Sequence, residues 1–296
     1  MFIKRTPLPI ILLISATFVF AKCHKDDPPP PPPPSGPTDT TAISKNLLAS
    51  TTHTSDSGVN TRTFRYDSQN RLVWFSNTST KANEFEDTSA IVRDAQGIIK
   101  QIIYRSDTSR KFPDPALDSV VYTLNYDAAT SKYTYKLLQY KSFKVAFKDS
   151  TFYTYDAQNR IVTETTNYFD YKTTKTYQPA SKTDYTYDAN GNLTTLNTIY
   201  YKVTSTSDYP FQINYTYDTT SVNLLNLGNE AIVVGLPQYY SAHMPATMIG
   251  TYSQNPEFNQ SLTYNYTYNT KYRPLKANIT DAANNNAKSS MAFTYQ

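Results

Sequence analysis

The sequence predicts an all-β domain, an antiparallel meander of long hairpins with roughly a dozen or more strands. A Tyr-Asp motif recurs at steps of 27 to 33 residues from Asp67 to Asp218. The residues before these aspartates alternate with period two, and helix signals are almost absent outside residues 222–235. Because so many strands rarely form a flat open sheet, we expect it to curl into a barrel-like or strongly twisted sheet.

The N-terminal residues 1–22 are typical of an export signal. Lys4 and Arg5 supply positive charge, and the apolar run that follows them is too short for a membrane-spanning helix. Two cleavage sites are compatible with the sequence. Ordinary signal peptidase would cut after Ala21, whereas residues 20–23 resemble a lipobox, in which the cysteine takes a lipid and becomes the new N-terminus.

The residues after the signal favour the lipoprotein. Cys23 is the only cysteine, so it has no internal disulfide partner. Lys25, Asp26 and Asp27 resemble the signal that sends lipoproteins of Bacteroidota to the outer face of the outer membrane. Seven consecutive prolines follow and favour a stiff spacer. We therefore expect a lipid-anchored tether over residues 23–42 that faces the cell exterior, with a periplasmic or secreted protein as the alternative.

The net charge gives little reason to expect a nucleic-acid partner. The chain has 28 basic and 24 acidic residues, and three of the basic residues precede Cys23. The mature chain therefore has 25 basic residues against 24 acidic ones, a net charge of +1, with no basic cluster. Residues 43–296 are long enough for one core and contain no proline- or glycine-rich joint, so we expect a single repeat domain.

Each Tyr-Asp copy is interpreted as a strand that ends in a turn. Tyr153 and Tyr155 lie on one face of the predicted strand, and Asp156 is expected to accept backbone N–H groups and begin the turn. Asn159 tolerates a positive φ, and Ile161 opens the return strand. The clearest copies span residues 64–72, 153–161 and 185–193.

The opposite turns of the hairpins are less clear in the sequence. Their candidates are residues 148–150, 178–180 and 207–210. With these turns, all Tyr-Asp turns lie along one edge of the sheet. The strand predicted over residues 133–147 carries lysines on both of its faces, which argues against a barrel embedded in lipid.

The Tyr-Asp copies resemble the YD repeats of Rhs-type shell proteins. The chain is more similar to a Bacteroidota family of lipoproteins of unknown function that has a porin-like fold. That similarity rests on the acid-tagged lipobox, the long hairpins and one late non-repeating segment, which includes residues 222–227 and 236–245. The resemblance implies a porin-like β fold with a short helical or loop insertion near 222–245, and it implies no activity.

The sequence gives little support for an enzyme or a cofactor. Three histidines without metal-ligand spacing and a single cysteine predict no metal site. Seven glycines leave no phosphate-binding loop. Paired carboxylates such as Glu84 and Glu86 could flank a glycosidic bond, but they are more simply explained as part of a solvated strand or loop.

The aromatic content suggests binding instead, because the chain has 27 tyrosines and 14 phenylalanines. We expect most of them to stabilise the sheet. Tyr239, Tyr240 and His243 lie where the repeat fails, and we predict binding there. The alternative is that residues 222–235 plug the sheet. The leading function is a surface lipoprotein that binds a glycan, a peptide or an envelope component, followed by a purely structural envelope protein and an uncharacterised hydrolase.

Overall fold

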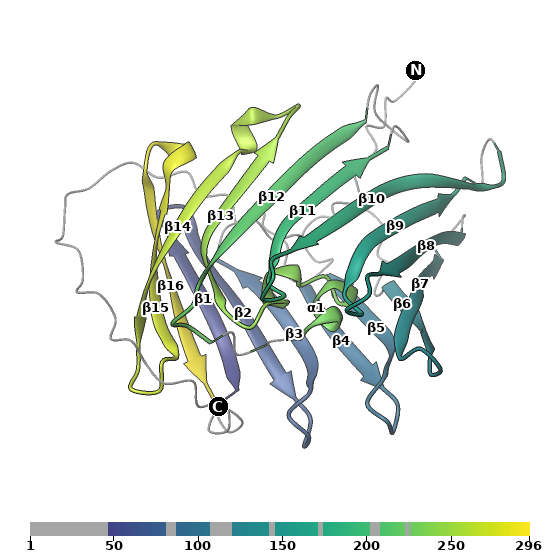
Figure 1. The fold of residues 1–296 in the computed structure, drawn as a ribbon, viewed down its shortest axis with the longest axis horizontal. Coiled ribbons are helices and arrows are strands. Elements are labelled where there is room, and N and C mark those ends of the chain that lie inside the picture. Colours follow the sequence, from purple (N-terminus) through teal and green to yellow (C-terminus); the bar gives the residue numbers. More distant parts are fainter. Residues whose placement is uncertain are drawn as a thin grey trace.

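The protein is a closed barrel of sixteen antiparallel strands in the computed structural model (Figure 1). The structure describes residues 47–80, 87–106, 120–141, 146–170, 174–201, 208–222, 225 and 227–296. The all-β meander expected from the sequence is confirmed, and the sheet closes fully. The predicted signal peptide, Cys23, its tether and the Glu84–Glu86 pair lie outside the described residues.

The strands contain seven to eleven residues each. They are β1 (Leu48–Ser55), β2 (Gly58–Tyr66), β3 (Leu72–Ser79), β4 (Asp87–Arg93), β5 (Ile99–Ser106), β6 (Val120–Asp127), β7 (Lys132–Lys141), β8 (Ala146–Tyr155), β9 (Ile161–Phe169), β10 (Tyr177–Tyr187), β11 (Leu193–Tyr200), β12 (Tyr209–Asp218), β13 (Met244–Tyr252), β14 (Gln260–Tyr268), β15 (Pro274–Asp281) and β16 (Ala287–Tyr295). Short helices are α1 (Asn229–Val233), η2 (Pro237–Tyr239), η3 (Pro256–Phe258) and η4 (Ala282–Asn284).

Each strand pairs with its neighbours in the sequence, and β1 pairs with β16 to close the barrel. Leu47 and Gln296 exchange two backbone hydrogen bonds of 3.0 and 3.1 Å beside this seam. Both chain ends of the barrel therefore lie at the end that carries the Tyr-Asp turns.

The Tyr-Asp turns have the predicted chemistry. Asp156 Oδ1 accepts hydrogen bonds of 2.9 Å from the backbone N–H groups of Gln158 and Arg160. Asn159 adopts a φ of 62°, and Arg160 Nε donates to Asp156 Oδ2 at 2.7 Å. The same pair of backbone bonds is accepted by the side chains of Asp67, Asp94, Asp188 and Asn269.

Five tyrosines at the ends of strands on this rim tie their hairpin to a neighbouring one. Tyr155 donates its hydroxyl to the carbonyl of Tyr133 at 2.7 Å. Tyr66 donates to the carbonyl of Leu48 at 2.9 Å in the same way. The same bond is made by Tyr187, Tyr217 and Tyr295 to the carbonyls of Ile161, Leu193 and Pro274. The repeat is therefore a chain of side-chain bonds around one rim, in addition to the ring contacts expected from the sequence.

The predicted turns at the other end were wrong in two cases. Residues 148–150 lie inside β8, and residues 178–180 lie inside β10. A strand paired on both sides outweighs a local turn preference, and Pro179 is accommodated at a bulge opposite β9. For the third candidate, β12 begins at Tyr209, and residues 202–207 are not described.

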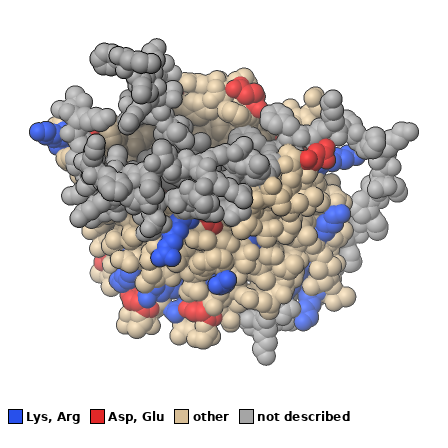
Figure 2. Space-filling view, turned by 180° about the vertical axis from the view of Figure 1, so that it is seen from behind, with Lys and Arg blue, Asp and Glu red and all other residues tan. Residues whose placement is uncertain are grey.

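The outer wall of the barrel is largely polar. Hydroxyl pairs join neighbouring strands there, such as Ser50 with Thr294 at 2.7 Å and Thr216 with Thr247 at 2.7 Å. A row of apolar side chains crosses the outer face of strands β3 to β6. One step further along the strands, the outward-facing positions are polar, with Thr88 on β4 opposite Arg105 on β5. On the face seen in Figure 2, acidic and basic residues lie among uncharged ones. A lipid-embedded barrel needs an apolar outer band about 25 Å tall, which this wall does not provide in the described strands.

Candidate functional site

The inside of the barrel is divided into two halves. The half next to the Tyr-Asp turns is apolar, and its aliphatic and aromatic side chains are almost completely buried. These include Phe64, Leu72, Ile91, Ile99, Ile161, Leu193, Leu196 and Ile213. The half towards the opposite turns carries charged and hydroxyl side chains on the same inward face.

The apolar half is filled by the segment between β12 and β13, which we call the plug (residues 219–243). Its helix α1 and the residues after it contribute Ala231, Ile232, Val233 and Leu236, each no more than 3% exposed. Figure 1 shows α1 within the ring of strands. For the described part of residues 222–235, burial of Leu225 and of the α1 side chains agrees with the interpretation of this segment as a plug. Among the described residues, no helix is long and apolar enough to cross a membrane.

The plug also completes the hydrogen bonding of the barrel. Each Tyr-Asp turn contains a bulge, and the first residue of the return strand turns its backbone N–H towards the lumen. Asn229 Oδ1 accepts this N–H from Ile161 at 3.0 Å, and Ser241 Oγ accepts it from Leu193 at 2.9 Å. In the last such hairpin the position is Pro274, which has no N–H to satisfy.

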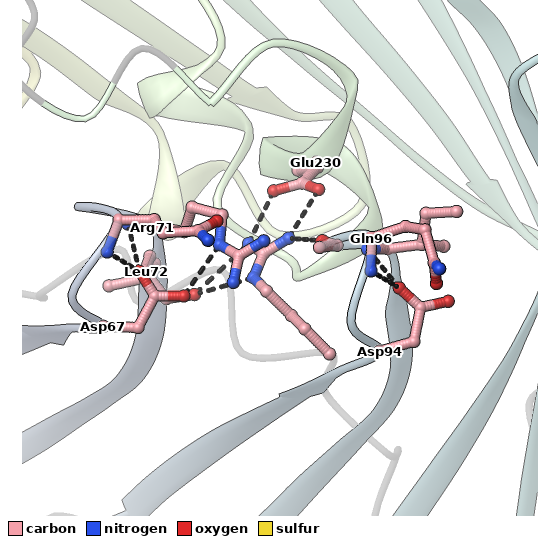
Figure 3. A network of polar contacts seen from close by, with 10 residues as sticks. Asp67, Arg71, Leu72, Asp94, Gln96 and Glu230 are labelled. Carbon is pink, nitrogen blue, oxygen red and sulfur yellow. Dashed lines mark hydrogen bonds and ion pairs between the residues drawn. The ribbon is translucent and has the colours of Figure 1, made fainter.

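An ion pair fastens the plug to the wall (Figure 3). Arg93 at the end of β4 donates two hydrogen bonds of 2.7 and 2.8 Å to the carboxylate of Glu230 in α1. It also donates to the carbonyls of Gly97 at 2.7 Å and Leu72 at 3.2 Å. Burial lowers the pKa of the Arg93 guanidinium, but hydrogen bonds and charge from Glu230 outweigh burial and raise that pKa. The guanidinium therefore stays charged.

A small pocket of about 230 Å³ lies beside this ion pair. Its wall includes Leu47, Arg71 and Leu227 as well as the Arg93–Glu230 pair. Because its polar groups already bond to one another, the pocket offers few free donors or acceptors.

The residues predicted to bind a ligand lie in the contact between plug and wall. Tyr239 packs edge-on against Phe64, with ring centroids 5.9 Å apart, and is 7% exposed. Tyr240 packs against Tyr187 at 5.0 Å and is 8% exposed. The imidazole Nδ1 of His243 is hydrogen-bonded to the backbone carbonyl of Ser221 at 2.7 Å. Binding at Tyr239 or Tyr240 would need the plug to leave the lumen, whereas His243 is only half-buried and its bond to Ser221 lies within the plug.

The sequence reading missed the polar half of the lumen. Lys136 on β7 and Glu164 on β9 are only 6% and 7% exposed. Lys136 Nζ lies 3.7 Å from Glu164 Oε1, and Tyr185 donates its hydroxyl to Glu164 Oε2 at 3.2 Å. For Lys136 a signal was present, because period-two alternation places it on the same face of its strand as buried Leu138. Glu164 follows Ile161 by three positions, so alternation alone would put these two on opposite faces, and the bulge beside Ile161 brings both inward.

Hydroxyl pairs continue this polar wall across the neighbouring strands. Thr151 and Thr166 are hydrogen-bonded at 3.0 Å, and Thr183 and Thr198 at 2.8 Å. Burial alone raises the pKa of the Asp149 carboxyl on the same face to about 6. These groups need water or another polar molecule as neighbours.

Two buried oxygens of the lumen have no hydrogen-bond partner among the described residues. One is the Tyr153 hydroxyl on β8, and the other is Asp87 Oδ2 on β4. Asp87 Oδ1 does accept a bond of 2.7 Å from Asn77, to which Arg62 donates at 2.6 Å. Burial, followed by the charge of Glu164, raises the pKa of Tyr153 well above its ordinary value, so its hydroxyl remains a proton donor.

The described residues contain no group of three or more histidine, cysteine, aspartate or glutamate side chains placed to hold a metal ion. The fold and the lumen together define a closed, plugged, porin-like β-barrel. No protein-family model matches the chain, and no curated protein sequence matches it.

Solved structures are similar in fold. A porin-like protein from Bacteroides vulgatus aligns with 85% of this chain and 99% of its own, at 14% identity and a TM-score of 0.49. A porin-like protein from Bacteroides uniformis aligns with 84% and 98%, at 12% identity and a TM-score of 0.47. The TcdB2-TccC3 protein aligns with 76% of this chain and 12% of its own, at 11% identity and a TM-score of 0.28. These similarities concern the fold alone.

Proposed function

We propose that this protein is a non-catalytic scaffold that binds a glycan in the polar half of its lumen, held at the outer surface of the outer membrane through lipidated Cys23. The observation that carries the proposal is the division of the lumen. A purely structural barrel gains nothing from burying Lys136, Glu164 and an unpartnered tyrosine hydroxyl, since each buried polar group costs free energy unless it finds a partner. A polar ligand would supply those partners.

The polar outer wall and the plug favour a scaffold over a pore. Threonine, serine and asparagine pairs cover much of the outside, where a lipid-embedded barrel needs apolar side chains. The plug fills one half of the lumen and is hydrogen-bonded to the wall. A passage for solutes would require these bonds to break.

A glycan fits this architecture better than a peptide does. Extended peptides commonly bind by adding a strand to the free edge of a sheet. The β1–β16 seam closes the barrel and leaves no such edge. A site inside the lumen instead offers side-chain hydroxyls, amides and charges, which match the donors and acceptors of a sugar.

The chain connectivity gives the scaffold an orientation. The tether that begins at Cys23 joins the barrel at Leu47, which lies at the plugged end beside Gln296. A lipid anchor at Cys23 would hold the plugged end towards the membrane. The polar half of the lumen would then lie on the side away from the membrane.

The anchor is tested by growing cells with a radiolabelled fatty acid. We expect the wild-type protein to be labelled and the Cys23→Ser variant to stay unlabelled while it is still exported. Absence of label from both proteins would instead favour cleavage after Ala21 and a secreted protein.

The binding function is tested with a glycan and peptide array and the full chain purified in a detergent without a sugar headgroup. We expect the wild-type protein to retain glycans. The Thr198→Val variant, which lacks a lumen hydroxyl, should bind them more weakly. Thr216→Val on the outer wall is the matched control and should bind like the wild type. Retention of peptides alone, or equal effects of the two variants, would contradict the proposal.

A purely structural role in the envelope is the second candidate. It is favoured by the plugged half, where the polar groups of the turns and the plug are largely bonded to one another. An envelope that leaks after deletion of the gene, together with a protein that retains no glycan, would support this role. A hydrolase remains a third candidate, and turnover of glycosides or esters by the purified chain would establish it.

A further inference from the structure

We propose that Lys136, Tyr153 and Glu164 form a subsite for a pair of adjacent hydroxyls on an uncharged sugar ring. This inference rests on the proposed function and names the residues and the ligand class. The three side chains come from consecutive strands β7, β8 and β9 and share the inward face of the wall.

The first support is the state of the Tyr153 hydroxyl. Tyr153 is 7% exposed, and its hydroxyl has no hydrogen-bond partner among the described residues. Leaving a buried hydroxyl without a partner costs about 1–3 kcal/mol. Tyr155, two residues later on the same face, is hydrogen-bonded to a backbone carbonyl, so the repeat itself does not leave its tyrosines unsatisfied. A bound hydroxyl or a water molecule is the natural partner of Tyr153.

The second support is the geometry of the Lys136–Glu164 pair. Its nitrogen and oxygen are 3.7 Å apart, beyond the usual length of a hydrogen bond between an ammonium and a carboxylate. One sugar hydroxyl placed beside both groups can accept from the ammonium and donate to the carboxylate. In the proposed subsite the adjacent hydroxyl of the same ring accepts from Tyr153, whose hydroxyl has no partner among the described residues.

The third support is the charge and the aromatic surroundings. One ammonium and one carboxylate give the pair no net charge, which disfavours both anionic and cationic ligands. Lys136 Nζ also lies 5.7 Å and 5.9 Å from the ring centres of Tyr122 and Tyr153, so aromatic rings already stabilise the ammonium. A neutral polyol satisfies the donors and acceptors without disturbing that balance.

The glutamate is held in place independently of any ligand. Tyr185 on β10 donates its hydroxyl to Glu164 Oε2 at 3.2 Å. That contact fixes one carboxylate oxygen and leaves Oε1 facing Lys136. Tyr185 is therefore a positioning residue for the subsite.

The test uses the full chain in a detergent without a sugar headgroup and ligand-observed NMR. The probes are the methyl pyranosides of glucose, galactose and mannose, their singly deoxygenated counterparts, and glucuronate and glucosamine as charged counterparts. We expect at least one neutral pyranoside to bind, and we expect loss of one hydroxyl of its adjacent pair to weaken binding at least tenfold, because the site then keeps an unpaired group.

The deciding variant is Tyr153→Phe, since it removes only the hydroxyl that has no protein partner. We expect it to fold with unchanged or higher thermal stability and to bind the neutral pyranoside at least fivefold more weakly. Tyr215→Phe on β12 is the matched control and should bind like the wild type. Pyranoside binding that is unaffected by Tyr153→Phe would overturn the subsite and leave the proposed function standing. Preference for glucuronate or glucosamine would overturn the neutral ligand class, and absence of all sugar binding would overturn both proposals.

Discussion

The two halves of the lumen treat their polar groups differently. In the plugged half, tyrosines such as Tyr155 donate to backbone carbonyls, and plug side chains accept the inward N–H groups of Ile161 and Leu193. Where the apolar half meets the polar half, the Tyr153 hydroxyl has no partner among the described residues, and Lys136 Nζ and Glu164 Oε1 lie 3.7 Å apart. The chain itself satisfies the hydrogen bonding of the polar groups in the plugged half, whereas polar groups further along the wall need another molecule as a partner.

The largest expected effect is on the plugged half. Arg93→Ala removes a buried guanidinium that bonds to Glu230 and to two backbone carbonyls. Breaking this pair should lower the free energy of unfolding by about 3 kcal/mol in urea titrations followed by circular dichroism. Arg65, which stacks on Trp74 at 4.3 Å on the outer wall, is the control, and Arg65→Ala should cost less than about 1 kcal/mol. Equal losses of unfolding free energy in the two variants would show that the contact between Arg93 and the plug stabilises the protein no more than a contact on the outer wall.

The second prediction compares the two tyrosines of one motif. Tyr155→Phe leaves the carbonyl of Tyr133 without its donor and should cost about 1–2 kcal/mol of unfolding free energy. Tyr153→Phe removes a hydroxyl without a partner and should cost nothing or stabilise the fold. Urea titrations of both variants provide the measurement. The contrast between the two halves fails if Tyr153→Phe is the more damaging change.

The third prediction concerns the turns of the plugged rim. Tyr272 adopts a φ of 57° at a position where two other turns place Asn70 and Asn159. Because glycine tolerates that conformation without strain, Tyr272→Gly should stabilise the protein by about 0.5–1 kcal/mol. Asn159→Ala should lower stability by about 1 kcal/mol at the equivalent turn. Thermal unfolding measures both, and destabilisation by Tyr272→Gly would mean that its side chain has a role of its own.

The smallest effect is expected from Asp149 in the polar half. Burial raises the pKa of this carboxyl to about 6, so the folded state binds a proton that the unfolded state has lost between about pH 4 and 6. This group therefore adds stability at low pH and loses it as the pH rises through 6. Asp149→Asn should stabilise the protein at pH 8 by at most about 1 kcal/mol, since the side chain is partly hydrated, and should change little at pH 4. Equal stabilisation by Asp149→Asn at pH 4 and pH 8 would rule out titration of this carboxyl as the cause.

The fold was predictable from the sequence because one local motif repeats. Asp156 and Asn159 specify a turn by their own chemistry, and the alternating tyrosines specify a strand. The plug was predictable in outline, since its apolar residues interrupt the repeat. The hydrogen bonds of the plug could not be predicted, because partners such as Asn229 and Ile161 lie 68 positions apart in the sequence.

The polar half of the lumen was hidden for a related reason. In the sequence, Lys136 is one of several lysines spread over both faces of its predicted strand, and the pattern does not tell which face is inward. Only closure of the sheet shows that its face of the strand points inward, where it meets Glu164 from another hairpin. The opposite turns were misplaced because they have no repeated motif, and Pro179 resembled a turn residue although it lies at a bulge.

The seam between β1 and β16 has a consequence for how the protein acquires its shape. It joins residues as distant as Ser50 and Thr294, which are 244 positions apart. Until that pairing forms, the other fifteen pairings leave a sheet with two free edges, which are prone to pair with other chains. Contacts this distant in sequence form slowly, because a long loop must close first. We therefore expect ring closure to be the slow step of folding and the stage at which the exported chain is most exposed to aggregation.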